Sequence, residues 1–396
     1  MKTNNTTIYK GAYFALAIAL VALIINFWAW SILSPLGVRY ASELSLSPTL
    51  LAALLAIPVI IGAIGRIIFG VLTDKFGGKL MFTVVCILSM IPVIALSFSH
   101  SYSQLMAGAF FLGIAGVTFV IGIPFISGWF PPNKRGLALG IYSMGNAGTA
   151  VAGFLTPRLD ETIGRQLTFL LVALLLFITA LVFIIFVKNA PGWKPPEGSS
   201  LKRLSRASKS RITWDLAAIY VITFGAFVAF GIYLPVLLKL SYHLPLTDAA
   251  TRAAGFVLVA TLARPIGGWL SDKFGGRNVI RVGLIFVALF AGIVAFQPAL
   301  RVHTTVAYLS LALALGCCNG AVFALVGKLS KPDIMGSMTG IIGAIGGMGG
   351  FLPPLVLGIT YQMTHSYSLA LVLLAICAVV VWLYINNQFN SPIYKK

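Results

Sequence analysis

Acidic residues are scarce in this chain, and so is charge of either sign. Its 396 residues include nine Asp and Glu, and charged residues make up 9% of the sequence, against about a quarter in a typical soluble domain. Apolar residues make up 59%, and the mean hydropathy is +0.97. Apolar runs of about 20 residues recur, each long enough to cross a bilayer. These features exclude a soluble globular protein. They predict an all-α membrane protein, since the alternating pattern of a transmembrane β-barrel is absent.

Side chains that hold metals or carry out redox chemistry are also few. The four cysteines lie within apolar runs, where we expect them to serve as small packing residues; they are Cys86, Cys317, Cys318 and Cys377. No Cys-x-x-Cys pair and no cluster of histidine and cysteine predicts a metal site, so we expect neither a metal nor a cofactor. The sequence also lacks a nucleophile–base set and a soluble output domain, which argues against a membrane enzyme or sensor.

The net charge of +19 would suggest nucleic-acid binding in a soluble protein, but membrane topology explains it here. With both termini in the cytoplasm, the inner segments hold twenty Lys and Arg residues and the outer segments hold six. This bias predicts a multi-pass protein of the cytoplasmic membrane with no nucleic-acid partner. Because no short signal-peptide core precedes a cleavage site, we expect the first apolar run to be retained as a span.

Twelve apolar runs have the length and composition of transmembrane helices. We predict spans at 11–36, 49–73, 81–99, 104–130, 137–158, 166–187, 212–240, 250–271, 280–297, 304–329, 337–362 and 366–387. A polar segment rich in Pro, Ser, Lys and Arg, 188–211, separates the first six from the last six. The sequence therefore predicts two six-helix halves, 1–187 and 212–396. We expect the basic cytoplasmic linker between them to be solvated and to face lipid headgroups.

An internal repeat relates the two halves. GRIIFGVLTDKFGGK at 65–79 and ARPIGGWLSDKFGGR at 263–277 share nine of fifteen residues, and GFLTP at 153–157 matches GFLPP at 350–354 at nearly the same offset. Chance similarity between apolar segments does not produce DKFGG twice. Two similar halves of six helices predict a pseudo-symmetric pair related by an axis along the membrane normal.

Each half keeps one arginine inside a predicted span. Arg66 and Arg264 occupy the same position of the repeat, each eight residues before the aspartate that begins the next loop. Eight residues correspond to about 12 Å of helix, which places each guanidinium near the middle of a core about 30 Å thick. A charge at that depth costs at least about 2.5 kcal/mol, so such residues face the protein interior and mark a binding site.

No acidic side chain is predicted at the depth of these arginines, because all nine lie in loops or at helix ends. They are Glu43, Asp74, Asp160, Glu161, Glu197, Asp215, Asp248, Asp272 and Asp333. We therefore expect the partner to be a diffusible anion, held between two guanidinium groups that offer paired N–H donors. The alternative is that each arginine packs against backbone carbonyls and only stabilises its helix.

Histidines follow the same distribution as the acids. All four lie in predicted loops, namely His100, His243, His303 and His365. No relay of titratable groups through the core predicts proton coupling. Exchange of one anion for another is then the simpler mechanism, because each anion in turn neutralises the arginines.

The repeated DKFGG motif, at 74–78 and 272–276, resembles the cytoplasmic loop motif of the major facilitator superfamily. We expect Asp74 and Asp272 to cap a neighbouring helix end or to pair with a cation, and the glycines after them to permit a sharp turn. The resemblance implies the major facilitator fold, with twelve transmembrane helices in two pseudo-symmetric halves. It also implies that the two aspartates form an inner latch.

Two glycine-rich segments, GNAGTAVAGFLTP at 145–157 and GIIGAIGGMGGFLPP at 340–354, are similar to the paired signatures of the nitrate/nitrite porter family. Glycine inside a helix costs about 0.8–1 kcal/mol, so these runs imply close helix packing, helix bending and sliding, or access to backbone polar groups. The glycines expected to serve the conformational change are Gly145, Gly148, Gly343, Gly346 and Gly347. The resemblance implies that Arg66 and Arg264 bind the substrate and that Asn146 lies beside it.

Aromatic residues complete the predicted site. Tyr220 and Phe224 are four residues apart in one span and share a helix face. The resemblance implies that they line the site, with the Tyr220 hydroxyl donating to the anion and Phe224 packing against it. Phe119 is a weaker candidate of the same kind, and core packing is the alternative for all three. Asn26 and Asn319 are polar residues within spans, either site members or helix–helix hydrogen-bonding residues.

Together these residues predict a secondary transporter of nitrate and nitrite that works by exchange and alternating access, in nitrate assimilation. The alternatives are an antiporter of formate or oxalate, whose oxygen geometry is similar, and a proton-coupled nitrate symporter. We expect a monomer in the lipid bilayer that binds a small inorganic anion and is not an enzyme.

Overall fold

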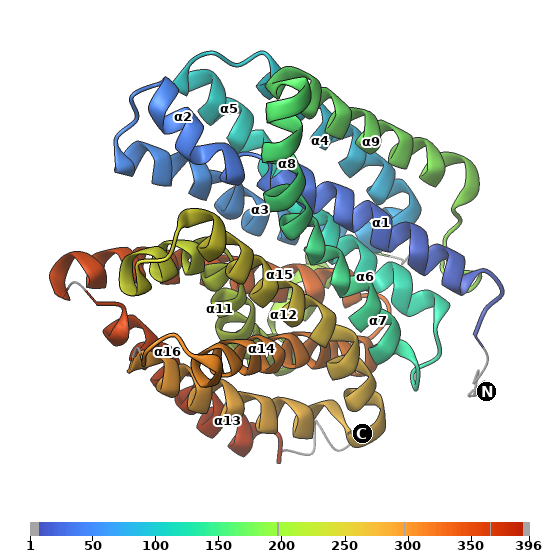
Figure 1. Cartoon of the computed structure of the whole chain (residues 1–396). Helices are drawn as coiled ribbons and strands as arrows, with labels where there is room; N and C mark the ends of the chain where they lie inside the picture. The colour runs from blue at the N-terminus through green and yellow to red at the C-terminus, as the bar shows by residue number, and fades with distance from the viewer. Residues whose placement is uncertain (1–7, 196–197, 297, 365, 391–396) are drawn as a thin grey trace. The chain divides into compact units, whose positions relative to one another are not determined.

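The computed structural model describes residues 8–195, 198–296, 298–364 and 366–390 (Figure 1). Throughout these residues the chain consists of helices and their connections, without a β-strand. This confirms the all-α fold class. Five residues used in the charge arguments lie outside the described residues, namely Lys2, Glu197, His365, Lys395 and Lys396.

The chain forms two compact units. Unit 1 comprises Met1–Pro131, Ile141–Ser208 and Lys331–Ala344, and unit 2 comprises Pro132–Gly140, Lys209–Ser330 and Ile345–Lys396. Each unit is therefore built mainly from one half of the sequence and takes in a short segment from the other half. Two helices contribute residues to both units, α7 (Arg135–Ser143) and α15 (Met335–Thr364).

The remaining helices each belong to one unit. Unit 1 contains α1 (Ala12–Ser31), η1 (Ser34–Leu36), α2 (Gly37–Glu43), α3 (Pro48–Phe76), α4 (Gly78–Ser97), α5 (Tyr102–Leu112), η2 (Gly113–Val117), α6 (Thr118–Trp129), η3 (Met144–Ala147), α8 (Gly148–Ile163), α9 (Arg165–Phe186) and α10 (Ser200–Ser208). Unit 2 contains α11 (Arg211–Tyr242), α12 (Leu246–Phe274), α13 (Gly276–Ala295), α14 (Val302–Leu329) and α16 (Ser368–Gln388). The elements labelled η are short 3₁₀ helices.

Repeat-related helices pack in the same pairs within the two units. In unit 1, α4 lies along α9 and α3 packs against η2 and α5; in unit 2, α13 lies along α16 and α12 packs against α14. The continuous segment from α5 to α6 is the most buried span of unit 1, and α14 is the most buried span of unit 2. The matching arrangement agrees with the pseudo-symmetry that the repeat predicts.

Ten helical segments among the described residues are long and apolar enough to cross a membrane, and they coincide with ten of the twelve predicted spans. The other two predicted spans are also helical. The span expected at 137–158 is divided into α7, η3 and α8, and the span expected at 337–362 is the single helix α15. The glycine-containing η3 interrupts the first of these, because its 3₁₀ geometry ends one α-helix and begins another.

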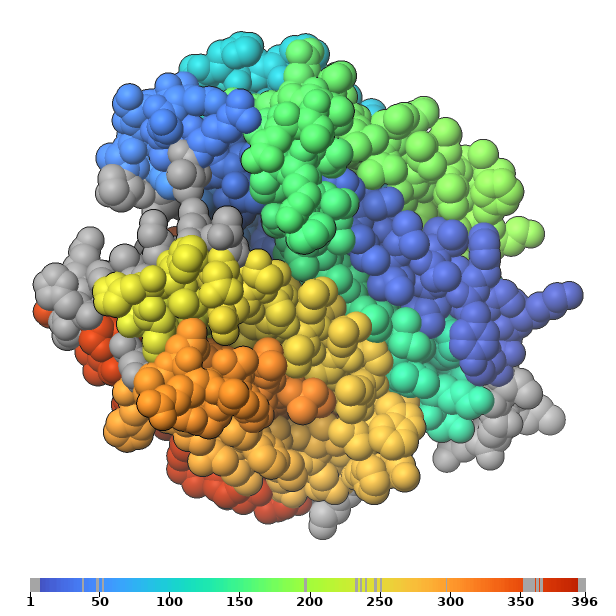
Figure 2. Space-filling view, viewed as in Figure 1, coloured from blue at the N-terminus to red at the C-terminus, as the bar shows by residue number. Residues whose placement is uncertain are grey.

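Helix surfaces that pack on another helix carry small residues, and helix surfaces on the outside of a unit carry exposed apolar residues. Between α12 and α14, a Cβ on Gly316 would overlap the carbonyl oxygen of Ala260, so only glycine permits this approach. On α9, which lies at the surface of unit 1 in light green in Figure 2, Ile185 and Phe186 are largely exposed. Such a face suits contact with lipid rather than water.

Two expectations from the sequence are wrong in detail. The linker is not simply solvated, because it contains α10, which packs against α3 and buries Arg203 to 1% exposure. The Arg203 Nη atoms donate to Gly198 O (3.0 Å) and Ser200 Oγ (2.9 Å), which lowers the cost of burying the charge. Cys377 is exposed on α16, so it does not pack within the chain as Cys86 and Cys318 do.

Candidate anion-binding site

Arg66 lies on α3 in unit 1 and is 2% exposed. Its Nε donates to the carbonyl oxygen of Gly116 (3.3 Å), and its Nη1 donates to the carbonyl oxygen of Gly343 (2.7 Å). Gly116 belongs to the 3₁₀ segment η2, and Gly343 belongs to the part of α15 that unit 1 takes in. The guanidinium is thus anchored by main-chain oxygens, as the alternative interpretation of the sequence expected. These bonds fix its direction and leave its charge in place.

Gly343 is a structural requirement of this anchor. A Cβ at this position would lie 2.8 Å from Val120 Cγ1 and 3.3 Å from Arg66 Cδ. Val120 is fully buried on α6, so it has little room to withdraw. A side chain at 343 would therefore displace the arginine that the carbonyl of the same residue holds.

Arg264 lies on α12 in unit 2 and is fully buried. Its guanidinium carbon lies 4.8 Å from the centre of the Phe227 ring and 5.9 Å from that of Phe224. A guanidinium over an aromatic face gains electrostatic attraction from the ring, worth more when both groups are desolvated. Aromatic ring faces are thus among the contacts that hold the second arginine.

The aromatic residues around Arg264 form one cluster. Tyr220 and Phe224 are stacked with ring centres 4.8 Å apart and an interplanar angle of 14°, which agrees with their predicted position on one helix face. Phe323 of α14 meets Tyr220 edge to face at 4.9 Å. Gly346 of α15 packs so closely on Tyr220 that a Cβ there would overlap the ring.

Sequence reasoning missed two members of this cluster, Phe227 and Phe323. Phe227 follows Phe224 by three residues and Tyr220 by seven, so helical spacing alone could have placed it on the same face. Phe323 lies on a different helix, and no local spacing signals its contact with Tyr220.

Phe119 and Asn146 are both buried in unit 1. Phe119 stacks on Tyr142 at 6.1 Å, and the Tyr142 hydroxyl donates to Thr118 O (2.8 Å). On η3, Asn146 Nδ2 donates to Ser143 O (2.8 Å), while its Oδ1 has no hydrogen-bond partner among the residues that the structure describes. Asn146 therefore retains acceptor capacity in a buried position.

The two polar residues that the sequence left open differ in their contacts. Asn26 donates to Ala22 O (2.9 Å) and to Cys86 Sγ (3.3 Å), so it links α1 to α4. Asn319 accepts from Thr223 Oγ1 (2.7 Å), which links α14 to α11. Its Nδ2 has no partner within the described part of the chain.

The glycines predicted to serve the conformational change lie where helices approach closely. A Cβ on Gly145 would lie 2.5 Å from Leu23 Cγ, and a Cβ on Gly148 would overlap the carbonyl oxygen of Ile24, so η3 and α8 lie directly on α1. Gly347 is buried as well. Close packing accounts for these glycines, and their part in motion stays a prediction.

The loop-motif aspartates cap helices, one in each unit. In unit 1, the Asp74 carboxylate accepts from Gly336 N (2.7 Å) and Ser337 N (2.8 Å) at the start of α15. In unit 2, the Asp272 carboxylate accepts from Gly136 N (3.1 Å) and Leu137 N (2.9 Å) at the start of α7. The expected capping contacts are therefore present in both units.

The two caps differ in their surroundings. Asp74 is buried, accepts a further bond from the Ser337 hydroxyl (2.6 Å), and lies within the electrostatic reach of Arg203 on the linker helix. The neighbouring Arg206 pairs with Asp333 at 2.8 Å, just before α15 begins. Asp272 is only half-buried, and its nearby cation is Lys328.

The described acidic residues all lie in loops or near helix ends. Within the described residues, no three His, Cys, Asp or Glu side chains gather closely enough to hold a metal ion. The contacts of Arg66 and Arg264 described above include carbonyl oxygens for the first and aromatic faces for the second.

Comparison with known proteins agrees with this arrangement. The sequence profile of the Major Facilitator Superfamily matches residues 19–354 and 254–393. The chain is 40% identical to the "Probable nitrate/nitrite transporter NarK2" of Mycobacterium tuberculosis over 97% of this chain and 98% of that protein. It is 36% identical to the "Nitrite extrusion protein" of Bacillus subtilis over 95% of each chain. It is 37% identical to the "Probable nitrate transporter NarT" of Staphylococcus haemolyticus over 96% of this chain and 98% of that one.

Solved structures of the same fold are more distant in sequence. The proton:xylose symporter XylE superposes with a TM-score of 0.76 over 96% of both chains at 13% identity. The human organic anion transporter MFSD10 superposes with a TM-score of 0.73 over 94% of this chain and 99% of that chain at 12% identity. The profile match and the whole-length relatives lead to one conclusion: this chain is a membrane transporter, not an enzyme, and belongs to the nitrate/nitrite porter family of the major facilitator superfamily.

Proposed function

We propose that the protein carries nitrate and nitrite across the cytoplasmic membrane by exchanging one anion for the other. Arg66 and Arg264 bind the anion, both termini lie in the cytoplasm, and the chain acts as a monomer. The observation that carries the proposal is the burial of one arginine in each repeat, among carbonyl oxygens in one case and aromatic rings in the other. The names of the whole-length relatives supply the identity of the anion.

The chemistry of these groups suits a small planar anion. A guanidinium offers coplanar N–H donors that match two oxygens of nitrate, nitrite or a carboxylate. A flat anion also stacks against an aromatic face such as Phe224, and the Tyr220 hydroxyl can donate to one oxygen. The acceptor at Asn146 Oδ1 disfavours an anion at that atom, so Asn146 would present its Nδ2 group after a rotation of the side chain.

Exchange follows from the cost of an empty site. Two buried positive charges without a ligand repel each other, so the change of access is favoured only when an anion is bound. The described acids lie near helix ends, which favours anion exchange over a proton relay through the middle of the spans. We propose that the Asp74 and Asp272 caps open and reform during this cycle, and that the glycines of η3, α8 and α15 permit helix sliding.

The proposal is tested by counterflow in proteoliposomes, with nitrate, nitrite, chloride, formate and oxalate as counter-anions. Wild type should exchange nitrate for nitrite and show little uptake into liposomes without a counter-anion. Arg66→Lys and Arg264→Lys keep the charge but lose the planar fork, so exchange should fall by about 10- to 100-fold. Arg158→Lys, at an exposed arginine on α8, is the matched control.

Three results would contradict the proposal. Normal exchange by both lysine variants would exclude the arginines as ligands. Faster exchange of formate or oxalate than of nitrate would favour the carboxylate antiporter. Nitrate uptake driven by a proton gradient, without a counter-anion, would favour symport.

A further inference from the structure

A polar cavity of about 220 Å³ lies in unit 1, where α2 ends and α5 and α9 begin. Its lining residues are Tyr40, Glu43, Leu44, Ser99, His100, Leu105 and Arg165. The distribution of lysine and arginine assigns these helix ends to the outer face. The cavity is therefore separate in sequence and in depth from Arg66, which lies mid-span on α3.

Four charged side chains form a balanced network at this cavity. Arg165 Nη2 donates to both carboxylate oxygens of Glu43, at 2.6 and 2.7 Å. Arg39 Nε donates to the same carboxylate at 2.9 Å, and Arg39 Nη1 pairs with Asp160. The arginine bonds hold the pKa of Glu43 below its usual value, so the carboxylate stays ionised and occupied by its partners.

Two groups at the cavity retain donor capacity, Tyr40 Oη and Arg165 Nε, while Asp160 Oδ1 of the network retains acceptor capacity. Tyr40 is 1% exposed, and neither its hydroxyl nor Arg165 Nε has a hydrogen-bond partner within the described part of the chain. Burial raises the pKa of Tyr40 to about 12, so its hydroxyl keeps a proton to donate. An arginine N–H can only donate. Two buried donors without acceptors are costly unless a ligand or water supplies the acceptor.

Helix termini add to this preference. α9 begins at Arg165 and has no side-chain cap, so its first-turn N–H groups and the positive end of its dipole lie at the cavity. α5 also begins beside His100, but its N-terminus is capped by Ser101 Oγ, which accepts from Gln104 N. The end of α2 opposes them, but the Glu43 carboxylate next to it is already bound by Arg39 and Arg165. The two unpartnered donors and the positive end of the α9 dipole thus favour an anion over a cation.

We propose that this cavity is a second anion site, which docks a small monovalent oxyanion at the outer face. The identity of the anion rests on the proposed function, and the docking itself does not. Tyr40 Oη and Arg165 Nε donate to two oxygens of the anion, while water fills the rest of the volume. Because the charges of the network balance, binding is weak, which suits a site that must pass its ligand on.

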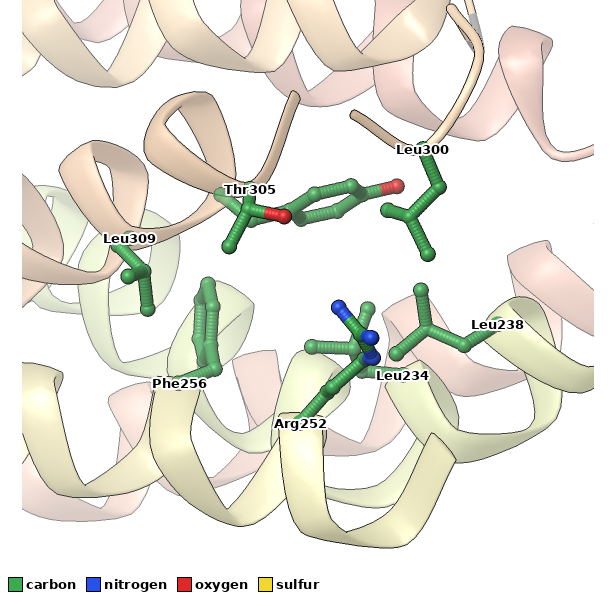
Figure 3. Close-up of a pocket in the computed structure, with 8 residues that line it drawn as sticks. Leu234, Leu238, Arg252, Phe256, Leu300, Thr305 and Leu309 are labelled. Atoms are coloured by element: carbon green, nitrogen blue, oxygen red, sulfur yellow. The ribbon is translucent and has the colours of Figure 1, made fainter. Parts of the chain in front are cut away.

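The corresponding outer end of unit 2 provides the control. A smaller cavity of about 40 Å³ lies between α11, α12 and α14, and Figure 3 shows the Arg252 side chain directed into it. Its other lining residues are mostly apolar: Leu234, Leu238, Phe256, Leu300, Thr305, Tyr308 and Leu309. Arg252 Nε donates to both oxygens of Asp248 at 3.1 Å. This cavity differs from the first mainly in volume, about 40 Å³ against about 220 Å³, because its Tyr308 hydroxyl is likewise buried without a hydrogen-bond partner in the described part of the chain.

The docking site is tested by anion titration of the purified full chain, with a fluorescent label on Ser103→Cys, an exposed position in the chain between the lining residues His100 and Leu105. Cys377→Ser removes the exposed native thiol. The titration is made in an Arg66→Lys, Arg264→Lys background, so that the mid-span site does not contribute, with sodium nitrate as ligand and sodium gluconate to keep the ionic strength constant. The label should respond with a saturable change in the millimolar range.

Two cavity variants decide the outcome. Tyr40→Phe keeps the ring over which Arg165 lies and removes only the hydroxyl, so the midpoint should rise about fivefold, the usual effect of one hydrogen bond. Ser99→Leu fills the cavity, so the response should disappear. Thr305→Val at the unit 2 cavity should leave the midpoint unchanged.

A cavity that holds only water would give no saturable response in the parent, and this would overturn the proposal. An unchanged midpoint in Tyr40→Phe, in a protein whose melting temperature matches the parent, would also overturn it. Failure of the proposed function would be seen in a different experiment, the counterflow assay, in which wild type would not exchange nitrate. The titration can therefore succeed or fail independently.

Discussion

Arg66 and Arg264 come from the same position of an internal repeat, yet they are held in different ways. In unit 1 the guanidinium donates to carbonyl oxygens, one of which comes from the 3₁₀ segment η2. In unit 2 it lies over the rings of Phe227 and Phe224. The repeat fixes where each arginine sits along its helix, and the neighbouring helices decide what holds it.

The difference follows from helix continuity. In unit 1, the spans that carry Gly116 and Asn146 are each broken by a 3₁₀ segment, where backbone groups become available to side chains. In unit 2, the repeat-related helix α14 is continuous, and the rings of Phe224 and Phe227 on α11 lie against Arg264. One arginine is therefore sensitive to backbone shifts and the other to the loss of ring faces.

The largest expected effect is from added methyl groups on α15. Gly343→Ala places a Cβ against Val120 and the Arg66 side chain, and Gly346→Ala places one within the Tyr220 ring. Each variant should reduce nitrate exchange about tenfold or more, because overpacking moves the binding groups. Gly153→Ala on α8 has open space around its Cβ and should exchange as wild type does. Equal activity of all three variants would show that neither contact matters.

The two aspartate caps should differ in stability. Asp74→Ala leaves two backbone N–H groups and the Ser337 hydroxyl without their acceptor in a buried place, so the free energy of unfolding should fall by about 2 kcal/mol. Asp272→Ala removes a half-buried cap with two bonds and should cost about 1 kcal/mol. Thermal unfolding in detergent measures both. Asp333→Ala, which breaks an exposed pair with Arg206, is the control, with an effect below about 0.5 kcal/mol.

A smaller effect is expected from the ring that holds Arg264. Phe227→Leu keeps the apolar volume but removes the ring face, so the half-saturating nitrate concentration should rise about two- to fivefold. The measurement is the concentration dependence of exchange. Phe230→Leu serves as the control, because Phe230 lies about one turn after Phe227 on α11 and packs on the Phe256 ring. If Phe227→Leu matches wild type, the ring contact contributes packing alone.

The smallest expected effect concerns the outer network of unit 1. The pKa of Glu43 is lowered by its hydrogen bond to Arg165, so ionised Glu43 stabilises the fold above its ordinary pKa, and this is lost as pH falls through the lowered value. Wild type should lose stability more steeply below about pH 4.5 than Glu43→Gln does. Since the carboxylate is partly exposed, the difference should stay below about 1 kcal/mol. Identical acid melting curves for wild type and Glu43→Gln would contradict this account, and Glu161→Gln is the control.

Much of this fold follows from sequence alone, because hydropathy and length determine membrane helices strongly. The aspartate caps were also predictable, since DKFGG recurs at repeat-related loops. The burial of Arg203 was not, because Ser, Lys and Arg in a linker have the composition of a solvated segment. The hydrogen bonds to Gly198 O and Ser200 Oγ, together with the nearby Asp74 carboxylate, reduce the cost of that burial.

The candidate site was predictable in its side chains and not in its backbone. Arg66, Arg264, Tyr220 and Phe224 have sequence signals, namely a charge in an apolar run and a helical spacing. The carbonyl oxygens of Gly116 and Gly343 have none, since every residue carries the same group. The 3₁₀ segment η2 makes the Gly116 carbonyl available, whereas Gly343 lies within the continuous helix α15. Phe323 lies on α14, far from Tyr220 in the sequence, so its contact with Tyr220 could be found only from the folded structure.

The central claim is that Arg66 and Arg264 bind the same anion. Isothermal titration of the purified protein with nitrate tests it most directly, using wild type, Arg66→Lys and Arg264→Lys. The account predicts one tight site per chain in wild type and loss of that site in either variant alone. If each single variant retained a tight nitrate site, the two arginines would act separately and the account would be wrong.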